Sequence, residues 1–191
     1  MLISLITMTA YAQNDVTKFL GIPVDGTKSE MIRKLKAKGF KSTYYDKEIL
    51  EGEFNGNKAT LIIQTNNNKV WRIIVGYEGL SEHVAKTRFN NLCYQFENNP
   101  KYHSTSIDYS IPDSEDISYE MTVNEKQYQA LYFQRSDKKL DIAKDDYSKH
   151  LFNDNLDKNK IVWFAILHSG SIYSIVIYYE NGYNEANGED L

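Results

Sequence analysis

The residues whose chemistry could support catalysis or metal binding are scattered along this chain of 191 residues. The imidazole side chains lie far apart in the sequence, at His83, His103, His150 and His168. None of them forms the His-x-x-x-His or Glu-x-x-His pair that places two ligands on one face of a helix. We therefore interpret them as structural or surface histidines, and expect no metal-binding residue.

Other motifs of catalysis and cofactor binding are also missing from the sequence. There is no Gly-x-Ser-x-Gly elbow, no Walker loop and no dinucleotide-binding glycine pattern, so no catalytic or cofactor-binding residue and no cofactor are predicted. The Asn- and Asp-rich stretches 153–159 and 180–190 lack the alternating template of a calcium loop and are interpreted as solvated loops. A pair of catalytic carboxylates, as in a glycosidase, stays an open possibility. Such a pair is defined by its separation in space, and 26 acidic residues offer too many candidates.

The single cysteine, Cys93, is at helical spacing from Phe89, Leu92 and Phe96. This pattern favours a small buried core residue over a reactive thiol. One cysteine cannot form an internal disulfide, so packing alone must stabilise the fold.

The first twelve residues resemble the end of a secretory signal peptide. Leu2 to Thr9 form an uncharged apolar run, and Ala10-Tyr11-Ala12 matches the small-x-small pattern before a cleavage site. We interpret residues 1–12 as a signal-peptide remnant and expect a periplasmic or secreted protein. Position 13 is glutamine, so the cysteine that carries the lipid of a lipoprotein is missing.

Composition narrows the classes of partner. A net charge of -4 without a basic stripe argues against nucleic-acid binding, which depends on Lys and Arg that neutralise phosphates. No apolar run approaches the roughly 20 residues that a transmembrane helix needs, so no transmembrane segment is expected.

Hydrophobic periodicity predicts two helices and a series of antiparallel strands. The helices are expected at 28–38, with Thr27 as N-cap and Gly39 as the stop, and at 81–98. Residues 100–127 are interpreted as a loop with at most short strands, and 137–160 as a charged segment with one helical turn at 145–151. The strands are expected at 40–45, 49–54, 58–65, 70–77, 128–135, 161–168 and 171–180.

The last two strands form a predicted hairpin with Ser169-Gly170 as its turn. One face holds Val162, Phe164 and Ile166 and belongs to the core. The other face is also mostly apolar and includes Trp163 and Tyr178, although a sheet with one face in water usually alternates more cleanly. Either helices and loops cover both faces, or one face presents an aromatic patch to a partner. In the strand from Val70, the alternation places one set on a shared face: Trp71, Ile73, Val75 and Tyr77.

The order of elements predicts an α+β fold, with an antiparallel sheet and helices packed on one face. We expect one domain over residues 13–191. Its halves, 17–78 and 81–180, each read as a helix plus a meander of strands, which suggests two pseudo-repeats.

Three segments carry a resemblance to a known group of proteins. They are 19–27 (FLGIPVDGT), 35–40 (LKAKGF) and the close of the chain from Tyr178-Tyr179-Glu180-Asn181 to Asn187-Gly188-Glu189-Asp190-Leu191. They resemble exported proteins of unknown function from Gram-negative gut bacteria. The layout is also similar to the folds of beta-lactamase inhibitor proteins and small outer-membrane assembly lipoproteins. This resemblance implies an α+β fold and a binding role, and it supplies no catalytic residue.

These observations predict a non-catalytic binding or envelope-associated module. Its sheet surface, including Trp163 and Tyr178, is expected to contact a protein or glycan in the cell envelope. The alternative is an extracytoplasmic hydrolase that acts on a glycan or peptide through unidentified carboxylates. A deep cleft with two carboxylates in unlike environments would favour the hydrolase. A flat or convex aromatic surface would favour the binding module.

Overall fold

The structure is a computed structural model that describes residues 15–104, 108–135 and 160–186. The signal segment predicted over 1–12, the helical turn predicted over 145–151 and the stretch 153–159 lie outside the described residues. Within the described residues, no helix is both long enough and apolar enough to cross a bilayer.

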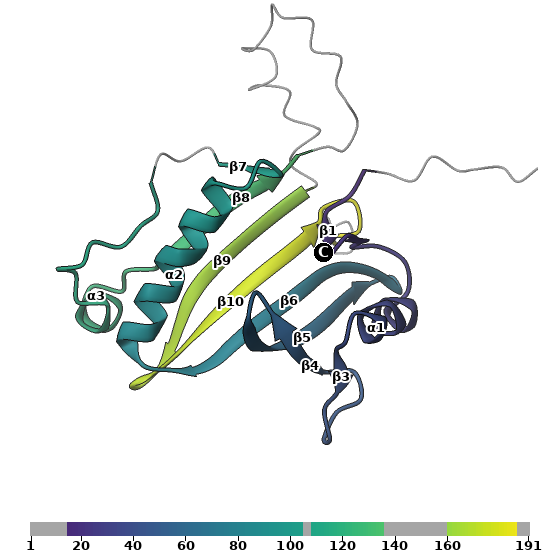
Figure 1. Ribbon diagram of the computed structural model, residues 1–191, viewed down its shortest axis with the longest axis horizontal. Coiled ribbons are helices and arrows are strands. Elements are labelled where there is room, and N and C mark those ends of the chain that lie inside the picture. Colours follow the sequence, from purple (N-terminus) through teal and green to yellow (C-terminus); the bar gives the residue numbers. More distant parts are fainter. Residues whose placement is uncertain (1–14, 105–107, 136–159, 187–191) are drawn as a thin grey trace, which may run out of the picture.

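An eight-stranded antiparallel sheet dominates the fold, with the strand order β3-β4-β5-β6-β10-β9-β8-β7 (Figure 1). Its strands are β3 (Lys41–Ser42), β4 (Leu50–Phe54), β5 (Asn57–Asn66), β6 (Lys69–Leu80), β7 (Tyr102–His103), β8 (Gln129–Gln134), β9 (Lys160–Ser169) and β10 (Ile172–Asn181). A separate two-stranded hairpin consists of β1 (Lys18–Phe19) and β2 (Ile22–Pro23).

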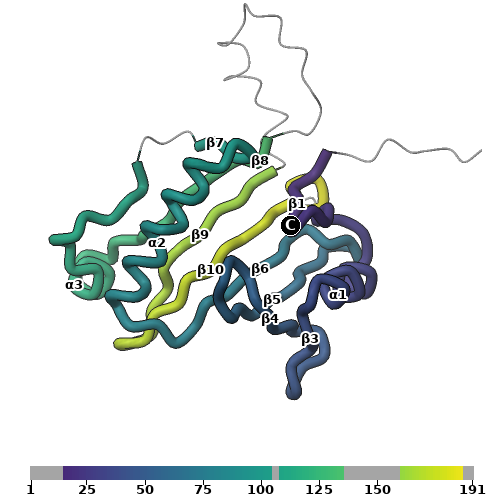
Figure 2. Tube along the Cα trace, viewed as in Figure 1, coloured from purple at the N-terminus to yellow at the C-terminus, as the bar shows by residue number. Residues whose placement is uncertain are grey.

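Each half of the chain contributes four strands to this sheet, and the last strands of the two halves, β6 and β10, pair at its centre. Figure 2 shows the two halves side by side, with the first half in purple to blue and the second in teal to yellow. A duplication over 17–78 and 81–180 stays a prediction, because strand order alone does not test internal sequence similarity.

The two predicted helices are confirmed as α1 (Lys28–Ala37) and α2 (Glu82–Glu97). At the start of α1, the Thr27 hydroxyl accepts from the backbone of Glu30, and the Glu30 carboxylate accepts from the backbone of Thr27. This capping box satisfies two N–H groups that the helix leaves free at its start. Gly39, at φ +102°, follows the end of α1 and allows the chain to turn into β3.

A third helix, α3 (Ile117–Val123), lies in the segment predicted to be a loop, so that part of the prediction was wrong. The Asp116 carboxylate caps this helix by accepting from the backbone N–H of Tyr119 at 2.8 Å. Its seven residues contain β-branched and aromatic side chains of modest helix propensity, which hid it in the sequence. Ile117 is fully buried, so packing against the core stabilises the helix.

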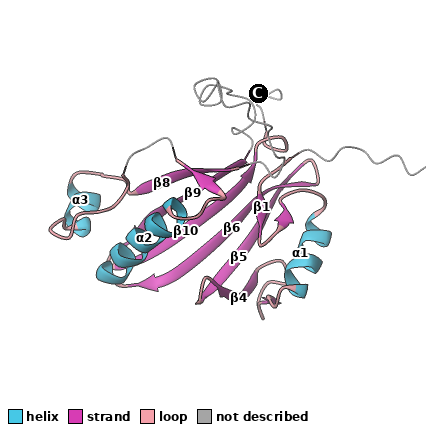
Figure 3. Ribbon diagram, turned by 45° about the horizontal axis from the view of Figure 1, so that its top comes forward, coloured by secondary structure: helices cyan, strands magenta, loops and turns pink. Residues whose placement is uncertain are grey.

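The helices cover one face of the sheet, as predicted. Figure 3 shows α2 across the strands of the second half and α1 beside the strands of the first half. The core between helices and sheet is one continuous cluster that includes Met31 and Leu35 of α1, Phe89 of α2, and Ile73 and Ile175 of the sheet. Cys93 is buried in this cluster, in agreement with the core prediction.

The final hairpin is present, but its turn is Gly170-Ser171 rather than Ser169-Gly170. Gly170 has φ +59°, which suits the first central position of a type II′ turn. The register therefore moves by two residues, which leaves every side chain on its predicted face because the period of a strand is two. The observed register places Trp163 directly opposite Tyr178.

Two strand predictions needed correction. The strand expected over 40–45 is limited to β3, and the loop that follows carries Tyr44 and Tyr45, which are 85% and 95% exposed. In β6, a bulge at Trp71 places two residues opposite one on β5. Val70 consequently joins the core with Ile73. Trp71 was predicted to share a face with Ile73, but it is not part of the core.

Candidate functional site

The sheet surface opposite the helices, called here the open face, is mostly apolar. The strand register places a row of apolar side chains across β5, β6, β10, β9 and β8, namely Ile62, Ile74, Tyr178, Trp163 and Leu131. The next row across the same strands contains Gln64, Arg72, Glu180, Ile161 and Phe133. Most of these side chains are partly accessible, and Ile62 is 41% exposed. No helix in the described part of the chain packs on this face.

Four side chains on the open face form a continuous stack across three strands. The rings of Trp163 and Tyr178 lie nearly parallel, with centroids 3.9 Å apart and planes inclined by 16°. The Arg72 guanidinium carbon lies 5.0 Å from the centroid of the Tyr178 ring and 3.9 Å from that of Trp71. The stack therefore contains one aromatic pair and two cation–π contacts.

The Glu180 carboxylate binds two members of this stack, Trp163 and Arg72. Glu180 Oε1 accepts a 2.8 Å hydrogen bond from the indole Nε1 of Trp163 and lies 2.5 Å from Nη2 of Arg72. The Glu180 side chain is largely buried, and Arg72 Nη1 lies 3.4 Å from Oε1 of Gln64. Arg72 Nε has no hydrogen-bond partner among the described residues. The open face therefore holds an ion pair within its aromatic stack.

The structure brings together the two residues that the sequence predicted for partner binding, Trp163 and Tyr178. Sequence reasoning missed Arg72, Trp71 and Glu180 as members of the same stack. Simple alternation placed Trp71 and Arg72 on opposite faces, and only the bulge at Trp71 brings them into contact. The sequence did contain a signal for Glu180: it lies two residues after Tyr178, and this spacing places both side chains on one face of β10.

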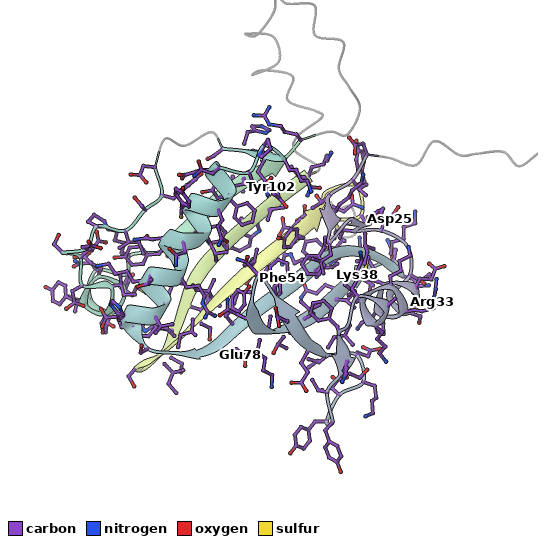
Figure 4. All side chains as sticks on the ribbon, in the orientation of Figure 1. Asp25, Arg33, Lys38, Phe54, Glu78 and Tyr102 are labelled. Atoms are coloured by element: carbon purple, nitrogen blue, oxygen red, sulfur yellow. The ribbon has the colours of Figure 1, made fainter. Side chains whose placement is uncertain are left out.

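A second candidate site lies on the helix side of the sheet. A cavity of about 840 Å³, the larger cavity, lies between the C-terminal half of α2, the β1–β2 hairpin and the end of β4. Phe54 and Tyr102 line two of its sides, and both are labelled in Figure 4. Three cationic residues also line it, namely Lys18, Lys101 and Arg135, against the single carboxylate of Glu53. The cavity is thus locally positive in a chain of net charge -4.

A hydrogen bond across the helix side separates this cavity from a neighbouring one. Asn55 Nδ2 donates to Gln95 Oε1 at 2.6 Å, which joins the β4–β5 turn to α2. Asn55 and Gly56 both have positive φ, as a type I′ turn requires. Beyond this bridge, a smaller cavity of about 310 Å³ is lined mainly by polar side chains, including His83 and Arg88.

Tyr102 and Tyr179 line the larger cavity, and Tyr77 lines the smaller one. Burial raises the pKa of the Tyr179 hydroxyl well above its usual value, and burial also raises the pKa of Tyr102. The interaction between these two hydroxyls raises the pKa of Tyr179 and lowers that of Tyr102. Burial likewise raises the pKa of Tyr77 to about 12.

Two observations on the described residues concern metal binding and thiol chemistry. Among them, no group of three or more His, Cys, Asp or Glu side chains is placed to hold a metal ion. Burial raises the pKa of the Cys93 thiol to about 12, so the nucleophilic thiolate is scarce at neutral pH.

Comparisons with protein-family models, with curated proteins and with solved structures found no match to this chain. The resemblance to exported proteins of gut bacteria and to the inhibitor and assembly-lipoprotein folds consequently stays a prediction.

Proposed function

We propose that this chain is an exported, non-catalytic binding module whose open face docks onto a protein partner. The observation that supports this proposal is the row of partly exposed apolar side chains around the Trp163–Tyr178 stack. Large apolar patches on a protein surface mark interaction sites, and Trp, Tyr and Arg are the residues that dominate binding energy at such sites. The export of the chain rests on the sequence of residues 1–12.

The geometry of the stack favours a protein over a glycan. A sugar ring binds an aromatic residue by lying on the face of its ring. Here Trp163 and Tyr178 cover one face of each other, and Arg72 covers the second face of Tyr178. The ring edges and the flanking aliphatic side chains are left for contact, which suits the apolar core of a protein interface.

The hydrolase alternative has less support. A glycosidase needs two carboxylates about 5 to 10 Å apart at the scissile bond. Glu53 is the single carboxylate among the described residues that line the two cavities. On the open face, Glu180 is already engaged by Trp163 and Arg72. A binding role therefore accounts for the exposed side chains more directly than a hydrolytic one.

The experiment is affinity capture from a cross-linked envelope extract of the host, using residues 13–191 as bait and mass spectrometry as readout. The test variant is Trp163→Ala/Tyr178→Ala, and the matched control is Tyr44→Ala/Tyr45→Ala. The control also removes two aromatic side chains, but from the exposed β3–β4 loop. Circular dichroism is measured on each variant to show that it is folded.

A protein that the unchanged bait and the control variant capture, and that the Trp163→Ala/Tyr178→Ala variant loses, would support the proposal. Ile62→Lys provides a milder second test, because Ile62 is 41% exposed and a lysine there adds charge to the apolar row with little loss of core packing. Capture that survives both open-face changes would contradict the proposal. Capture that is lost only in the control would move the site to the β3–β4 loop.

A further inference from the structure

The larger cavity has the size and composition of a small-ligand site. Its volume of about 840 Å³ lies within the range of roughly 300 to 1,000 Å³ that ligand pockets occupy. Nothing in the proposed role of the open face uses it, since it lies on the opposite side of the sheet. Two of its cationic residues, Lys101 and Arg135, lie at one end, where β7 and β8 meet the end of α2.

The aromatic walls of the cavity are held in place by their neighbours. On the α2 side, the ring of Tyr102 packs edge-on against Phe96, with centroids 4.7 Å apart. On the opposite side, the Phe54 ring lies 5.2 Å from Phe19, and Tyr179 lies between the two sides, 6.4 Å from Phe54. Such walls are preorganised to accept a flat or ring-shaped group, because little conformational entropy is lost on binding.

The cationic end of the cavity is fixed through the backbone. The Arg135 N–H donates to the Lys101 carbonyl at 2.7 Å, and the Arg135 carbonyl accepts from Nζ of the buried Lys160 at 3.0 Å. These bonds hold the Cα positions of Lys101 and Arg135 next to each other. No ion pair joins either side-chain cation to a carboxylate in the described ranges.

The Tyr102 hydroxyl adds a directional donor beside these cations. Its oxygen accepts from Gln134 Nε2 at 3.2 Å. The amide of Gln134 is itself occupied by the backbone of Lys18, through bonds of 2.6 Å and 3.0 Å. Because a hydroxyl can accept and donate at the same time, Tyr102 can still donate its own proton toward a ligand in the cavity.

From this geometry we infer that the larger cavity binds a small ligand that carries a carboxylate and a ring, either aromatic or saturated. The carboxylate contacts Lys101, Arg135 and the Tyr102 hydroxyl, and the ring packs between Phe54 and Tyr102. Guanidinium and ammonium groups form strong charge-assisted hydrogen bonds with carboxylates, and a phenolic donor adds a third. An acidic sugar and a peptidic carboxylate share this chemistry, so the experiment distinguishes these two sources.

The test is a calorimetric titration of the folded chain with two acid and neutral pairs. Glucuronate is compared with glucose, and N-acetylphenylalanine with N-acetylphenylalaninamide. We expect one acid to bind, with its neutral counterpart at least about tenfold weaker because the charged contacts are lost. The acid that binds identifies the source as sugar or peptide.

Variants assign the binding to the cavity. Lys101→Gln/Arg135→Gln should weaken the acid at least about tenfold, while Arg33→Gln/Lys36→Gln, on the exposed side of α1, should leave it unchanged. The control removes the same net charge, so it corrects for long-range electrostatics. Tyr102→Phe, which deletes only the hydroxyl, should reduce the preference for the acid over its neutral counterpart.

Several results would overturn this inference. They are failure of both acids to bind at millimolar concentration, equal binding of acid and neutral ligand, and equal weakening by the cavity and control variants. The inference does not depend on the proposed open-face function, because none of the variants alters the open face. Loss of partner capture and loss of acid binding would therefore be separate failures.

Discussion

Two adjacent residues of β9, Trp163 and Phe164, allow a quantitative test of which sheet face is the core. Phe164 is fully buried, and its ring lies 5.1 Å from Phe89 and 5.5 Å from Phe96, measured between centroids. Replacing such a residue with alanine costs about 3 to 5 kcal/mol, from lost burial and from the cavity that is left. We therefore expect Phe164→Ala to lower the free energy of unfolding by about 4 kcal/mol.

Trp163 is the larger residue, yet its replacement should cost less. The ring is partly exposed, and Trp163→Ala removes one stacked pair and one hydrogen bond to a carboxylate that Arg72 still neutralises. Together these losses amount to about 1 to 2 kcal/mol. With a urea m-value of about 2 kcal/mol/M, the midpoint of Phe164→Ala should lie roughly 1 M below that of Trp163→Ala.

The assay is equilibrium urea unfolding of both variants and the unchanged chain, followed by far-ultraviolet circular dichroism. Phe164→Leu provides a milder substitution at the same position in case the alanine variant does not fold. If Trp163→Ala is as destabilising as Phe164→Ala, the face that carries Trp163 is buried in solution. That result would refute the open face and, with it, the proposed docking surface.

Three further predictions concern Cys93, Tyr77 and Gly52. Burial raises the pKa of Cys93 to about 12, so Cys93 should not react with Ellman's reagent at pH 8 in the folded chain. It should react fully in 6 M guanidinium, as measured by absorbance at 412 nm. Rapid reaction of the folded protein would contradict its burial. Tyr77 has a folded pKa of about 12 against 10.0 for the free group, so the unfolded state loses its proton first and stability should fall as pH rises between these values. Urea unfolding at pH 9 and pH 11 should show a smaller loss of stability in Tyr77→Phe than in the unchanged chain, and an equal loss in both would argue against this role of Tyr77. Gly52→Ala should cost about 1 to 3 kcal/mol, because the added Cβ would lie 2.6 Å from Cδ1 of the Phe40 ring. Urea unfolding should show a smaller cost in a Phe40→Leu background, and equal costs in the two backgrounds would rule out this contact as the cause.

Much of the fold was predictable because the signals that specify it are local. The start of α1 depends on Thr27 and its end on Gly39, and both residues act through the backbone of their own turn. The faces of β9 and β10 follow from a period of two, which survives the two-residue error in the register of their turn. The burial of Cys93 followed from its helical spacing to large apolar neighbours.

The errors arose where distant parts of the chain decide the local structure. Helix α3 has weak intrinsic propensity and is held by the burial of Ile117 in a core built from other segments. The bulge at Trp71 depends on pairing between β5 and β6, which alternation along one strand cannot reveal. The short β3 ends where the chain turns away from β4, although the residues beyond it favour strands.

The amino-acid sequence by itself determined the α+β class, the two main helices and the faces of the final hairpin, which place Trp163 and Tyr178 on the same side of the sheet. These properties follow from backbone propensities and from the periods of helix and strand, which act over a few residues. Only the tertiary structure decided that one sheet face stays open, that Arg72 joins the stack, and that Lys101, Tyr102 and Arg135 meet at one cavity. Residues far apart in sequence reach such sites through strand order and register, and these are set by packing of the whole core.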